Sequence, residues 1–288
     1  MNKQLLVQTK PLISFSAAIV CYNSPSHELT KLLISLLDSI EQLRKSFELP
    51  EIPVYLIDNS DEDPVEFNML SVVDEERVGA LGVGLRLVHG QGNIGYGSAH
   101  NLVISNLNSD FHLLLNPDVE LQKSTLTIGI NFLLENPEVI VASPHAVDDK
   151  GDKQYLCKRY PSVFTFLIRG VFPNWLKNIF QSRLASYEMH NLSESEPSAD
   201  ISIVSGCFML LRSTSLKEIE GFDERYFLYF EDFDLSLRLG KKGKLAYLPA
   251  MHIQHSGGHA ASKGLSHFKM FTRSGIRFFN THGWHFIR

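Results

Sequence analysis

Regular structure begins with the apolar run Ser14-Phe15-Ser16-Ala17-Ala18-Ile19-Val20-Cys21, which leads directly into Tyr22-Asn23-Ser24-Pro25. Apolar residues then recur at helical spacing, namely Leu29, Leu32, Leu33, Leu36, Leu37, Ile40 and Leu43. The run is short and interrupted by serines, so a buried strand explains it better than a signal peptide. The sequence predicts this strand and then a helix with Ser24 as its N-cap and Pro25 at its first position.

The same alternation continues along the first half of the chain. Further apolar, β-rich runs are expected to be strands at 54–57, 85–88, 112–115 and 139–142. Helices are expected between them, one of them capped by Ser124. Strands separated by helices predict an α/β fold with a mostly parallel central sheet and helices on both faces. From about 145 to 200 the pattern breaks, and we expect the aromatic stretch 164–180 to cross over a cleft.

Bulk composition excludes several classes of protein. The 288 residues and 32.6 kDa suit one large α/β domain or two small ones. A net charge of −5 with a pI near 6.2 argues against a general nucleic-acid-binding protein. Cys21, Cys157 and Cys207 are widely spaced, which fits a reducing compartment and excludes a cysteine-rich zinc site. No segment reaches the roughly 18 apolar residues that span a bilayer, so a cytoplasmic location is expected.

Carboxylates follow two of the predicted strands. Asp58 and Asp118 each come directly or shortly after an apolar run, where ligands bind in an open α/β sheet. Asp58 suits the imide N–H of uracil or thymine, and Asp118 suits Mg²⁺ or Mn²⁺ on a diphosphate. Each also has a purely structural explanation: an Asx-turn for Asp58 and a turn after Pro117 for Asp118.

Gly90-Gln91-Gly92-Asn93-Ile94-Gly95-Tyr96-Gly97 contains the pattern G-x-G-x-x-G. It follows the third strand instead of the first, and no ribose-binding acid follows at the right distance, so a dehydrogenase is disfavoured. The loop still allows a close approach of backbone to ligand, and we expect Asn93 and Asn101 to supply polar contacts.

An acidic pair, Glu231-Asp232, opens a predicted helix behind an aromatic loop. The positive end of the helix dipole would keep a carboxylate there ionised and ready to accept a proton. Acidic residues are also favoured in any first helical turn, which is the structural alternative.

Three histidines, His252, His255 and His259, come after a last predicted strand at 245–248. Gly257 and Gly258 break any helix that would place them on one face, so a zinc site of three histidines is disfavoured. One histidine that completes an oxygen-rich divalent site is the better hypothesis, and a histidine in a polar loop is the alternative.

Together these segments resemble the family 2 inverting glycosyltransferases of the GT-A fold, particularly bacterial rhamnosyltransferases. The resemblance covers about 14–258 and is carried by these segments: Ile19-Val20-Cys21-Tyr22-Asn23, Leu56-Ile57-Asp58-Asn59-Ser60, 92–97 with Asn101, Leu115-Asn116-Pro117-Asp118, Ser205-Gly206-Cys207-Phe208-Met209, 221–238 and 249–255.

The resemblance implies a role for each of these polar residues. Asp232 would be the base that deprotonates the acceptor hydroxyl, and Glu231 would position acceptor or base. Asp118 would hold a divalent metal, Mg²⁺ or Mn²⁺, on the donor diphosphate, with His255 as a further ligand. The donor nucleotide would be bound by Asp58, Asn93, Gly95, Asn101 and Asn116. The family's acid-x-acid motif is here Asn116-Pro117-Asp118, which leaves one carboxylate fewer for the metal.

The implied activity is transfer of a sugar, L-rhamnose from dTDP-rhamnose, to a glycan or polyprenyl-diphosphate-linked acceptor in surface-polysaccharide synthesis (O-antigen or capsule). Alternatives are a UDP-hexose or UDP-galactofuranose donor, and a non-catalytic nucleotide-sugar-binding module. The expected organisation is one GT-A domain over 1–264, with a nucleotide-sugar half at 14–145 and an acceptor half at 146–260.

The remaining segment, 265–288, is basic and aromatic. It carries Lys269, Arg273, Arg277 and Arg288 and no acidic residue, and Phe268, Phe271 and Phe279 could share a helical face. Two explanations stay open: peripheral contact with the cytoplasmic face of the inner membrane, or packing of the aromatics onto the domain.

Overall fold

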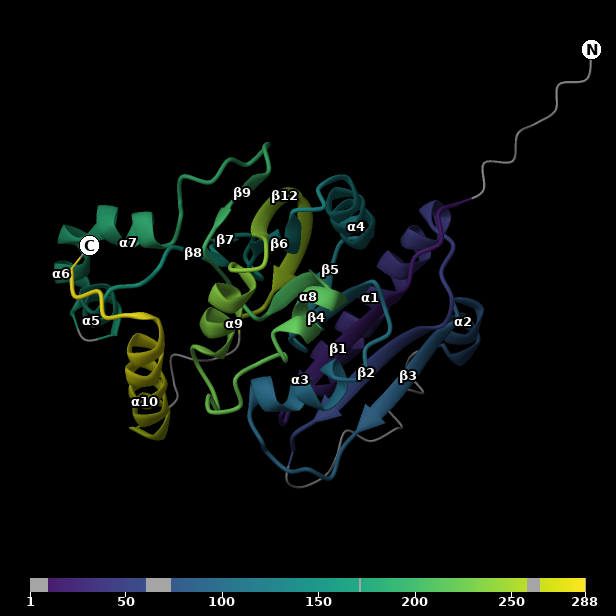
Figure 1. Cartoon of the computed structure of the whole chain (residues 1–288), viewed down its shortest axis with the longest axis horizontal. Helices are drawn as coiled ribbons and strands as arrows, with labels where there is room; N and C mark the ends of the chain where they lie inside the picture. Colours follow the sequence, from purple (N-terminus) through teal and green to yellow (C-terminus); the bar gives the residue numbers. More distant parts are fainter. Residues whose placement is uncertain (1–9, 61–73, 171, 258–264, 288) are drawn as a thin grey trace, which may run out of the picture.

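The computed structural model describes residues 10–60, 74–170, 172–257 and 265–287. Its centre is a ten-stranded sheet with the order β3-β2-β1-β4-β11-β6-β12-β5, to which β7 and β9 add at β6 and β12 (Figure 1). The strands are β1 (Phe15–Cys21), β2 (Ile52–Asp58), β3 (Val83–Val88), β4 (Phe111–Leu115), β5 (Val119–Leu121), β6 (Val139–Val147), β7 (Lys153–Gln154), β9 (Ser198–Ile201), β11 (Phe208–Arg212) and β12 (Lys244–His255). A small second sheet pairs β8 (Cys157–Lys158) with β10 (Ile203–Val204).

Most long strands of the sheet run in one direction. β1 is parallel to β2 and β4, and β2 is parallel to β3. β11 is antiparallel to both β4 and β6, so these two share a direction, and β12 is parallel to β6. The predicted α/β fold with a mostly parallel sheet is therefore confirmed. The antiparallel strands are β11, which lies inside the sheet, and the short strands β5, β7 and β9.

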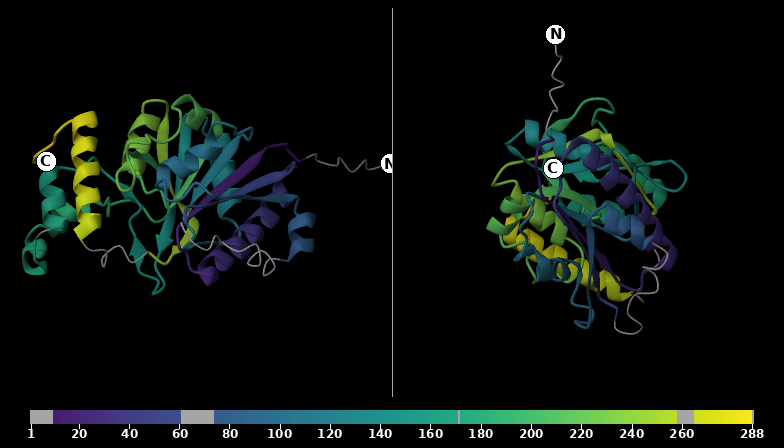
Figure 2. Two further views of the ribbon diagram at one scale, coloured as in Figure 1. Left: turned by 90° about the horizontal axis from the view of Figure 1, so that it is seen from below. Right: turned by 90° about the vertical axis from the view of Figure 1, so that its right-hand side faces the viewer.

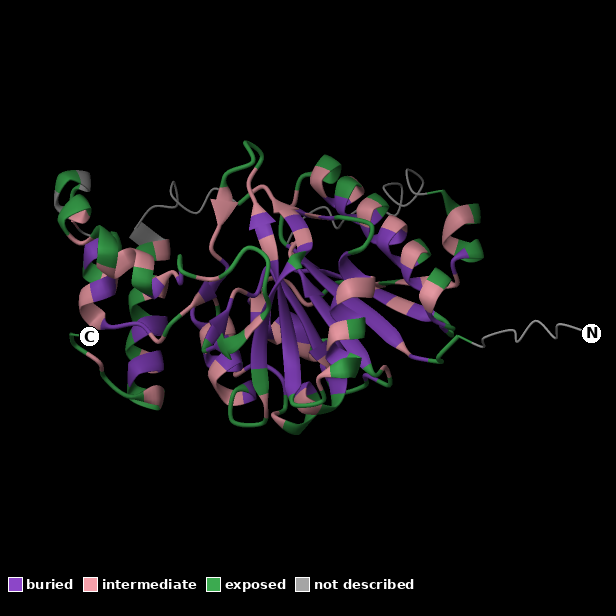
Figure 3. Cartoon of the chain, turned by 90° about the horizontal axis from the view of Figure 1, so that it is seen from above, coloured by how far each residue is buried: buried purple, intermediate pink, exposed green. Residues whose placement is uncertain are grey.

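Helices cover both faces of this sheet, as predicted (Figure 2). One face is covered by α1 (Ser26–Ser46), α2 (Glu75–Ala80) and α4 (Thr125–Glu135). The other is covered by α3 (Tyr96–Ile104), α8 (Ser213–Glu218) and α9 (Glu231–Leu239). The strands between them are almost wholly buried (Figure 3).

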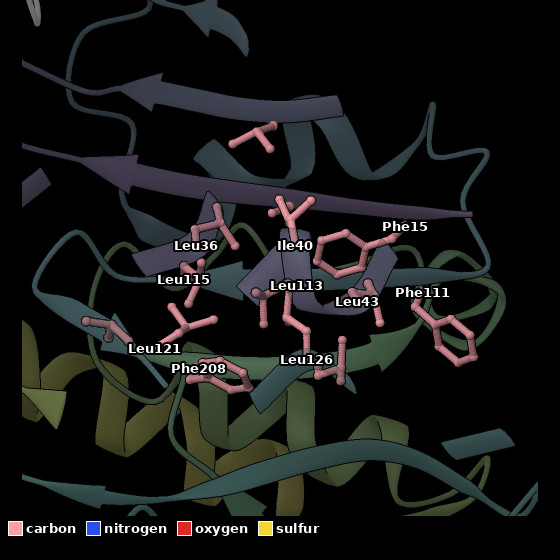
Figure 4. Packing of buried hydrophobic residues seen from close by; sticks show 14 of the residues in the cluster. Phe15, Leu36, Ile40, Leu43, Phe111, Leu113, Leu115, Leu121, Leu126 and Phe208 are labelled. Atoms are coloured by element: carbon pink, nitrogen blue, oxygen red, sulfur yellow. The ribbon is translucent and has the colours of Figure 1, made fainter. Parts of the chain in front are cut away.

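The first strand shows why its sequence is apolar throughout. Phe15, Ala17 and Ile19 pack toward α1 and α4, in the cluster of Figure 4, whereas Ala18 and Val20 pack toward α3. A strand covered on both faces has no solvent side, so its residues do not alternate between apolar and polar.

The start of α1 differs from the prediction by one residue. Pro25 is extended, with φ −58° and ψ 133°, and is itself the N-cap, so the helix begins at Ser26 without a side-chain cap. Ser24 instead accepts a hydrogen bond from the Tyr22 N–H at 3.3 Å. Ser124 does occupy the N-cap of α4, but its side chain makes no capping hydrogen bond.

Four helices form the end of the molecule beyond α9 (Figures 1 and 2): α5 (Val163–Gly170), α6 (Asn174–Ile179), α7 (Gln181–Tyr187) and α10 (Leu265–His282). The predicted excursion at 164–180 is thus helical. Its Phe166 ring lies 5.2 Å from Phe230 and 5.5 Å from Phe271, measured between centroids.

Helix α10 packs several of its aromatic residues, as the packing alternative expected. Phe278 and Phe279 are buried together with Tyr226 and Phe230, which defines the aromatic cluster of the protein. Phe268, by contrast, stays 62% exposed. None of the helices in the described residues is long and apolar enough to cross a membrane.

Candidate active site

Asp58 is the last residue of β2 and is buried. Its Oδ1 accepts a hydrogen bond from the Ser60 N–H at 3.0 Å, which is the Asx-turn of the structural alternative. The Asp58 carbonyl accepts a hydrogen bond from Gln91 Nε2 at 2.8 Å. The strand-end position is confirmed, and the contact with a pyrimidine stays a prediction.

The glycine-rich loop before α3 is shaped by contacts within the protein. Asn93 Oδ1 accepts a hydrogen bond from the Gly95 N–H at 3.2 Å. Gly95 has φ +91°, and a Cβ there would lie 2.3 Å from the Phe227 carbonyl oxygen. Glycine is therefore required at 95 by the close approach of the 222–227 loop, and this explains its place in the motif without a ligand.

Asn101 on α3 holds that same loop. Its Nδ2 donates to the Phe222 carbonyl at 2.9 Å, and its Oδ1 accepts from the Phe222 N–H at 2.9 Å. Nδ2 also lies 3.1 Å from Glu224 Oε1. The amide thus has a structural role that the sequence alone did not reveal, and its contact with the donor nucleotide stays a prediction.

Asp118 and His255 lie together beside the turn between β4 and β5. His255 is the last residue of β12 and pairs with Val119 of β5, so it stands next to Asp118. His255 Nε2 and Asp118 Oδ2 are 3.5 Å apart. The structure thus brings the two predicted metal ligands together, and His255 belongs to a strand instead of a polar loop.

Gln154 of β7 orients the His255 ring. Gln154 Nε2 donates to the His255 carbonyl at 2.9 Å, which turns its Oε1 toward His255 Nδ1 at 2.7 Å. An acceptor at this distance places a proton on Nδ1, so the neutral ring carries its lone pair on Nε2, the atom that faces Asp118. Sequence reasoning missed Gln154 because it lies where the strand–helix pattern breaks.

The chemistry of this pair suits a divalent cation that is shared with a diphosphate. Mg²⁺ is commonly bound through one or two carboxylates plus substrate phosphates, and imidazole nitrogen suits transition metals. No group of three or more His, Cys, Asp or Glu with metal-binding geometry occurs among the described residues. His252 lies on β12 against His145, with ring centroids 5.2 Å apart, and His259 lies outside the described residues.

The acidic pair opens α9 as predicted. Tyr229 and Phe230 have positive φ values of 68° and 67°, an uncommon conformation for bulky residues that is found at functional sites. Asp232 is partly exposed, and its two oxygens accept hydrogen bonds from the Gly206 and Phe233 N–H groups, each at 3.0 Å.

Backbone contacts link Asp232 to the end of β4. The Gly206 carbonyl accepts a hydrogen bond from the Tyr96 hydroxyl at 2.6 Å. The adjacent Cys207 carbonyl accepts from the Asn116 N–H at 2.9 Å. The turn 205–207 therefore lies between the segment that carries Asn116 and Asp118 and the carboxylate of Asp232.

Burial dominates the electrostatics of the acidic pair. It raises the pKa of Glu231 to about 8, and the neighbouring Asp232 charge adds to this. Burial also raises the pKa of Asp232, and the hydrogen bonds from Gly206 and Phe233 offset part of that. The helix dipole was expected to keep a carboxylate at this position ionised. For Glu231 this is wrong, because the cost of desolvating its charge outweighs the dipole.

Lys158 of β8 is a basic neighbour that the sequence did not single out. Burial lowers its pKa to about 8, and its charge in turn lowers the pKa of Asp232. Lys158 Nζ lies 4.0 Å from Glu188, which also pairs with Arg169 at 3.5 Å.

A family model described as glycosyl transferase family 2 matches residues 16–219. The chain belongs to this family. The match ends before Glu231, Asp232 and His255, so the placement of these residues in a family 2 glycosyl transferase rests on the geometry above.

Curated relatives and solved structures agree with the family. The chain is 29% identical over 192 residues to N-acetylglucosaminyl-diphospho-decaprenol L-rhamnosyltransferase of Mycobacterium tuberculosis H37Rv, covering 62% of this chain and 61% of the relative. It is 25% identical over 186 residues to rhamnosyltransferase WbbL of Escherichia coli K12, covering 61% of this chain and 66% of the relative. The match therefore spans less than two thirds of each relative.

Two solved structures have the same fold. One is GalNAc-T7 with UDP, GalNAc and Mn²⁺, at TM-score 0.63 and 14% identity, covering 93% of this chain and 48% of that one. The other is S. aureus TarS 1–349 with UDP-GlcNAc, at TM-score 0.54 and 16% identity, covering 93% of this chain and 67% of that one. Together with the mixed sheet, they confirm the GT-A fold of this family 2 glycosyl transferase.

The buried Glu231 has a measurable cost for stability. The pKa of Glu231 is raised from 4.5 to about 8 in the folded state. The contribution of its protonated form to the free energy of unfolding is therefore fully present below pH 4.5 and is lost as the pH rises toward 8. Glu231→Gln should therefore melt higher than the wild type near pH 8, by about 2–4 °C for each kcal/mol removed, and the gain should shrink toward pH 4.5. Calorimetric melting across this range measures it. A gain that does not change with pH would contradict the raised pKa.

Proposed function

We propose that the protein is an inverting glycosyltransferase that moves L-rhamnose from dTDP-rhamnose to a polyprenyl-diphosphate-linked or polysaccharide acceptor. The proposed setting is surface-glycan synthesis, such as that of O-antigen or capsule. The observation that carries it is the partly exposed Asp232, held by Gly206 beside the strand end of Asn116 and Asp118. The rhamnosyltransferases among the relatives support the sugar, and the decaprenol-linked substrate in one name supports the acceptor class.

The proposed reaction is a single displacement. The acceptor hydroxyl oxygen bonds to the anomeric carbon, Asp232 takes the hydroxyl proton, and the bond from that carbon to the diphosphate oxygen breaks. The nucleoside diphosphate leaves with both electrons of this bond, and the configuration is inverted. A divalent metal bound at Asp118 and His255 would supply Lewis-acid stabilisation of that leaving group. Asp58 would bind the pyrimidine, and Glu231 would position the acceptor or Asp232.

A UDP-sugar donor is the second candidate. The two structural neighbours were solved with UDP and with UDP-GlcNAc, and an imide contact at Asp58 is the same for uracil and thymine. A non-catalytic nucleotide-sugar-binding module is a third candidate. It is disfavoured because Asp118, Glu231, Asp232 and His255 are all present. A buried acid with a raised pKa, such as Glu231, is also typical of a catalytic site.

We further propose a cytoplasmic enzyme with peripheral contact to the membrane through its C-terminal part. Phe268 and Trp284 are 62% and 42% exposed there, beside basic residues of α10.

Release of nucleoside diphosphate tests the function directly. The purified protein would be incubated with dTDP-rhamnose, UDP-galactofuranose or a UDP-hexose and a polyprenyl-diphosphate-linked acceptor, with Asp232→Asn as the matched control. We expect acceptor-dependent release of dTDP from dTDP-rhamnose. Release from UDP-sugars alone would select the second candidate, and binding without release from any donor would select the third.

A further inference from the structure

A hollow of about 370 Å³ lies between α10 and the loop that precedes α9, outside the residues assigned to sugar transfer. Its lining consists of Arg225, Arg273, Ile276, Arg277, Asn280 and Thr281. Three of its six lining residues are therefore arginines, in a chain whose net charge is −5. Such segregation of charge indicates an anionic ligand.

Two acidic residues close to Tyr226, Asp223 and Asp234, already have partners. Asp223 binds Arg225 through Nε and Nη2, at 2.8 and 2.6 Å, a pair that does not use Nη1. Asp234 is buried and binds His282 at 2.8 Å and Arg238 at 2.7 Å. Within the part of the chain that the structure describes, no carboxylate forms an ion pair with Arg273 or Arg277, so their charges are available to a ligand.

Helix α10 concentrates cations on one face. Lys269, Arg273 and Arg277 follow one another at intervals of four residues, and the segment 265–288 contains no acidic residue. Like charges at this spacing repel one another and destabilise a helix. An anion bound between them would remove that cost.

The hollow is arranged for a ligand that is both anionic and partly apolar. The Arg277 guanidinium lies over the Tyr226 ring, 5.8 Å from its centroid, which restrains its orientation. Asn280 Oδ1 accepts a hydrogen bond from Trp284 Nε1 at 2.9 Å, so its amide hydrogens remain as donors. Ile276 adds an apolar side chain that is 48% exposed.

We propose that Arg225, Arg273 and Arg277 bind the phosphate group of a lipid. Guanidinium groups bind phosphate oxygens through two parallel hydrogen bonds, and the volume suits a diphosphate or a phospholipid headgroup. The ligand class rests on the proposed membrane contact and acceptor, and its source is either a bilayer phospholipid or the diphosphate of a polyprenyl acceptor. Arg225 stands seven residues before Asp232, so the bound lipid would lie next to the segment that carries the base.

Binding measurements on the full chain test this site without any need for sugar transfer. The probes are sedimentation with vesicles of phosphatidylcholine and phosphatidylglycerol, and calorimetric titration with geranyl diphosphate in vesicle-free buffer. Arg273→Gln should weaken the affinity more than 10-fold. Arg273→Lys should weaken the affinity nearly as much, because an ammonium group keeps the charge but lacks the planar pair of N–H donors that a guanidinium offers to phosphate.

Lys269→Gln is the matched control, since Lys269 lies on the same face of α10 but does not line the hollow. The affinity of Lys269→Gln should fall by at most about fivefold, as for the loss of a single charge near an anionic surface. Loss of geranyl diphosphate binding in Arg273→Gln assigns the acceptor diphosphate, and loss of vesicle binding alone assigns the phospholipid. The proposal is overturned if the wild type binds neither probe. It is also overturned if Arg273→Lys binds like the wild type, or if Arg273→Gln loses no more than Lys269→Gln.

Discussion

Asp232→Asn should lower kcat by about 100-fold or more while leaving donor binding nearly unchanged, as expected for loss of a general base. The carboxamide has the same shape but cannot take a proton. It also keeps one acceptor for the Gly206 and Phe233 N–H groups that now hold both carboxylate oxygens. The fold should therefore survive with a small loss of stability. Steady-state kinetics and titration with the nucleoside diphosphate separate the two effects.

The pH profile gives an independent readout of this assignment. A base must be deprotonated to act, and burial raises the pKa of Asp232, so kcat/KM should rise with pH through a value above the ordinary aspartate range. This rise of kcat/KM with pH should be absent in Asp232→Asn. Glu231→Gln is the matched comparison: if it is inactive while Asp232→Asn turns over normally, the base is Glu231. Normal activity in both would refute a base at this position.

Sequence periodicity was sufficient to predict the sheet and the helices on both sides of it. The leucines of α1 and the apolar run of β1 are buried as expected. A helix that buries one face shows apolar residues at helical spacing, and a strand that is buried on both faces shows a continuous apolar run. Asp58, Asp118 and Asp232 were selected as candidate site residues from their predicted positions after strands or at a helix start.

Other parts of the site depend on contacts between distant segments, which have no local pattern. Asn101 and Gly95 stand in a motif that suggests a ligand, yet each meets the 222–227 loop more than 120 residues away in sequence. Gln154 reaches His255 only because β7 and β12 both pair with β6.

The C-terminal segment shows the same limit of local patterns. From sequence, its aromatic residues suit a helix at a membrane surface as well as a helix packed onto the domain. In the structure, Phe278 and Phe279 are buried against Tyr226 and Phe230, and His282 binds Asp234. A chain that ends before α10 would expose this cluster. The predicted boundary at 264 falls outside the described residues, and single substitutions on α10 are therefore a better probe than truncation.

Asp118→Ala should abolish the increase in nucleoside-diphosphate affinity that Mg²⁺ or Mn²⁺ confers, and excess EDTA should do the same to the wild type. The predicted metal ligands are Asp118 and His255, of which Asp118 is the carboxylate. The first acidic residue of the acid-x-acid motif is replaced by Asn116 and cannot take its place. Calorimetric titration of dTDP with and without metal measures the effect. Asp149→Ala is the matched control, because Asp149 lies nearby and accepts its hydrogen bonds from Gln254 and Ser256 instead of facing His255 Nε2.

Gln154→Leu extends the same experiment to the orientation of His255. Loss of a residue that fixes the tautomer of a metal-binding histidine typically costs about 10–100-fold in metal affinity. Gln254→Leu, one residue from His255 but bonded to Asp149, should cost nothing comparable. Full activity and full donor affinity in excess EDTA would refute the metal altogether. The charge of the leaving diphosphate would then have to be stabilised by the protein. Lys158, whose charge lowers the pKa of Asp232, is a basic candidate for this role.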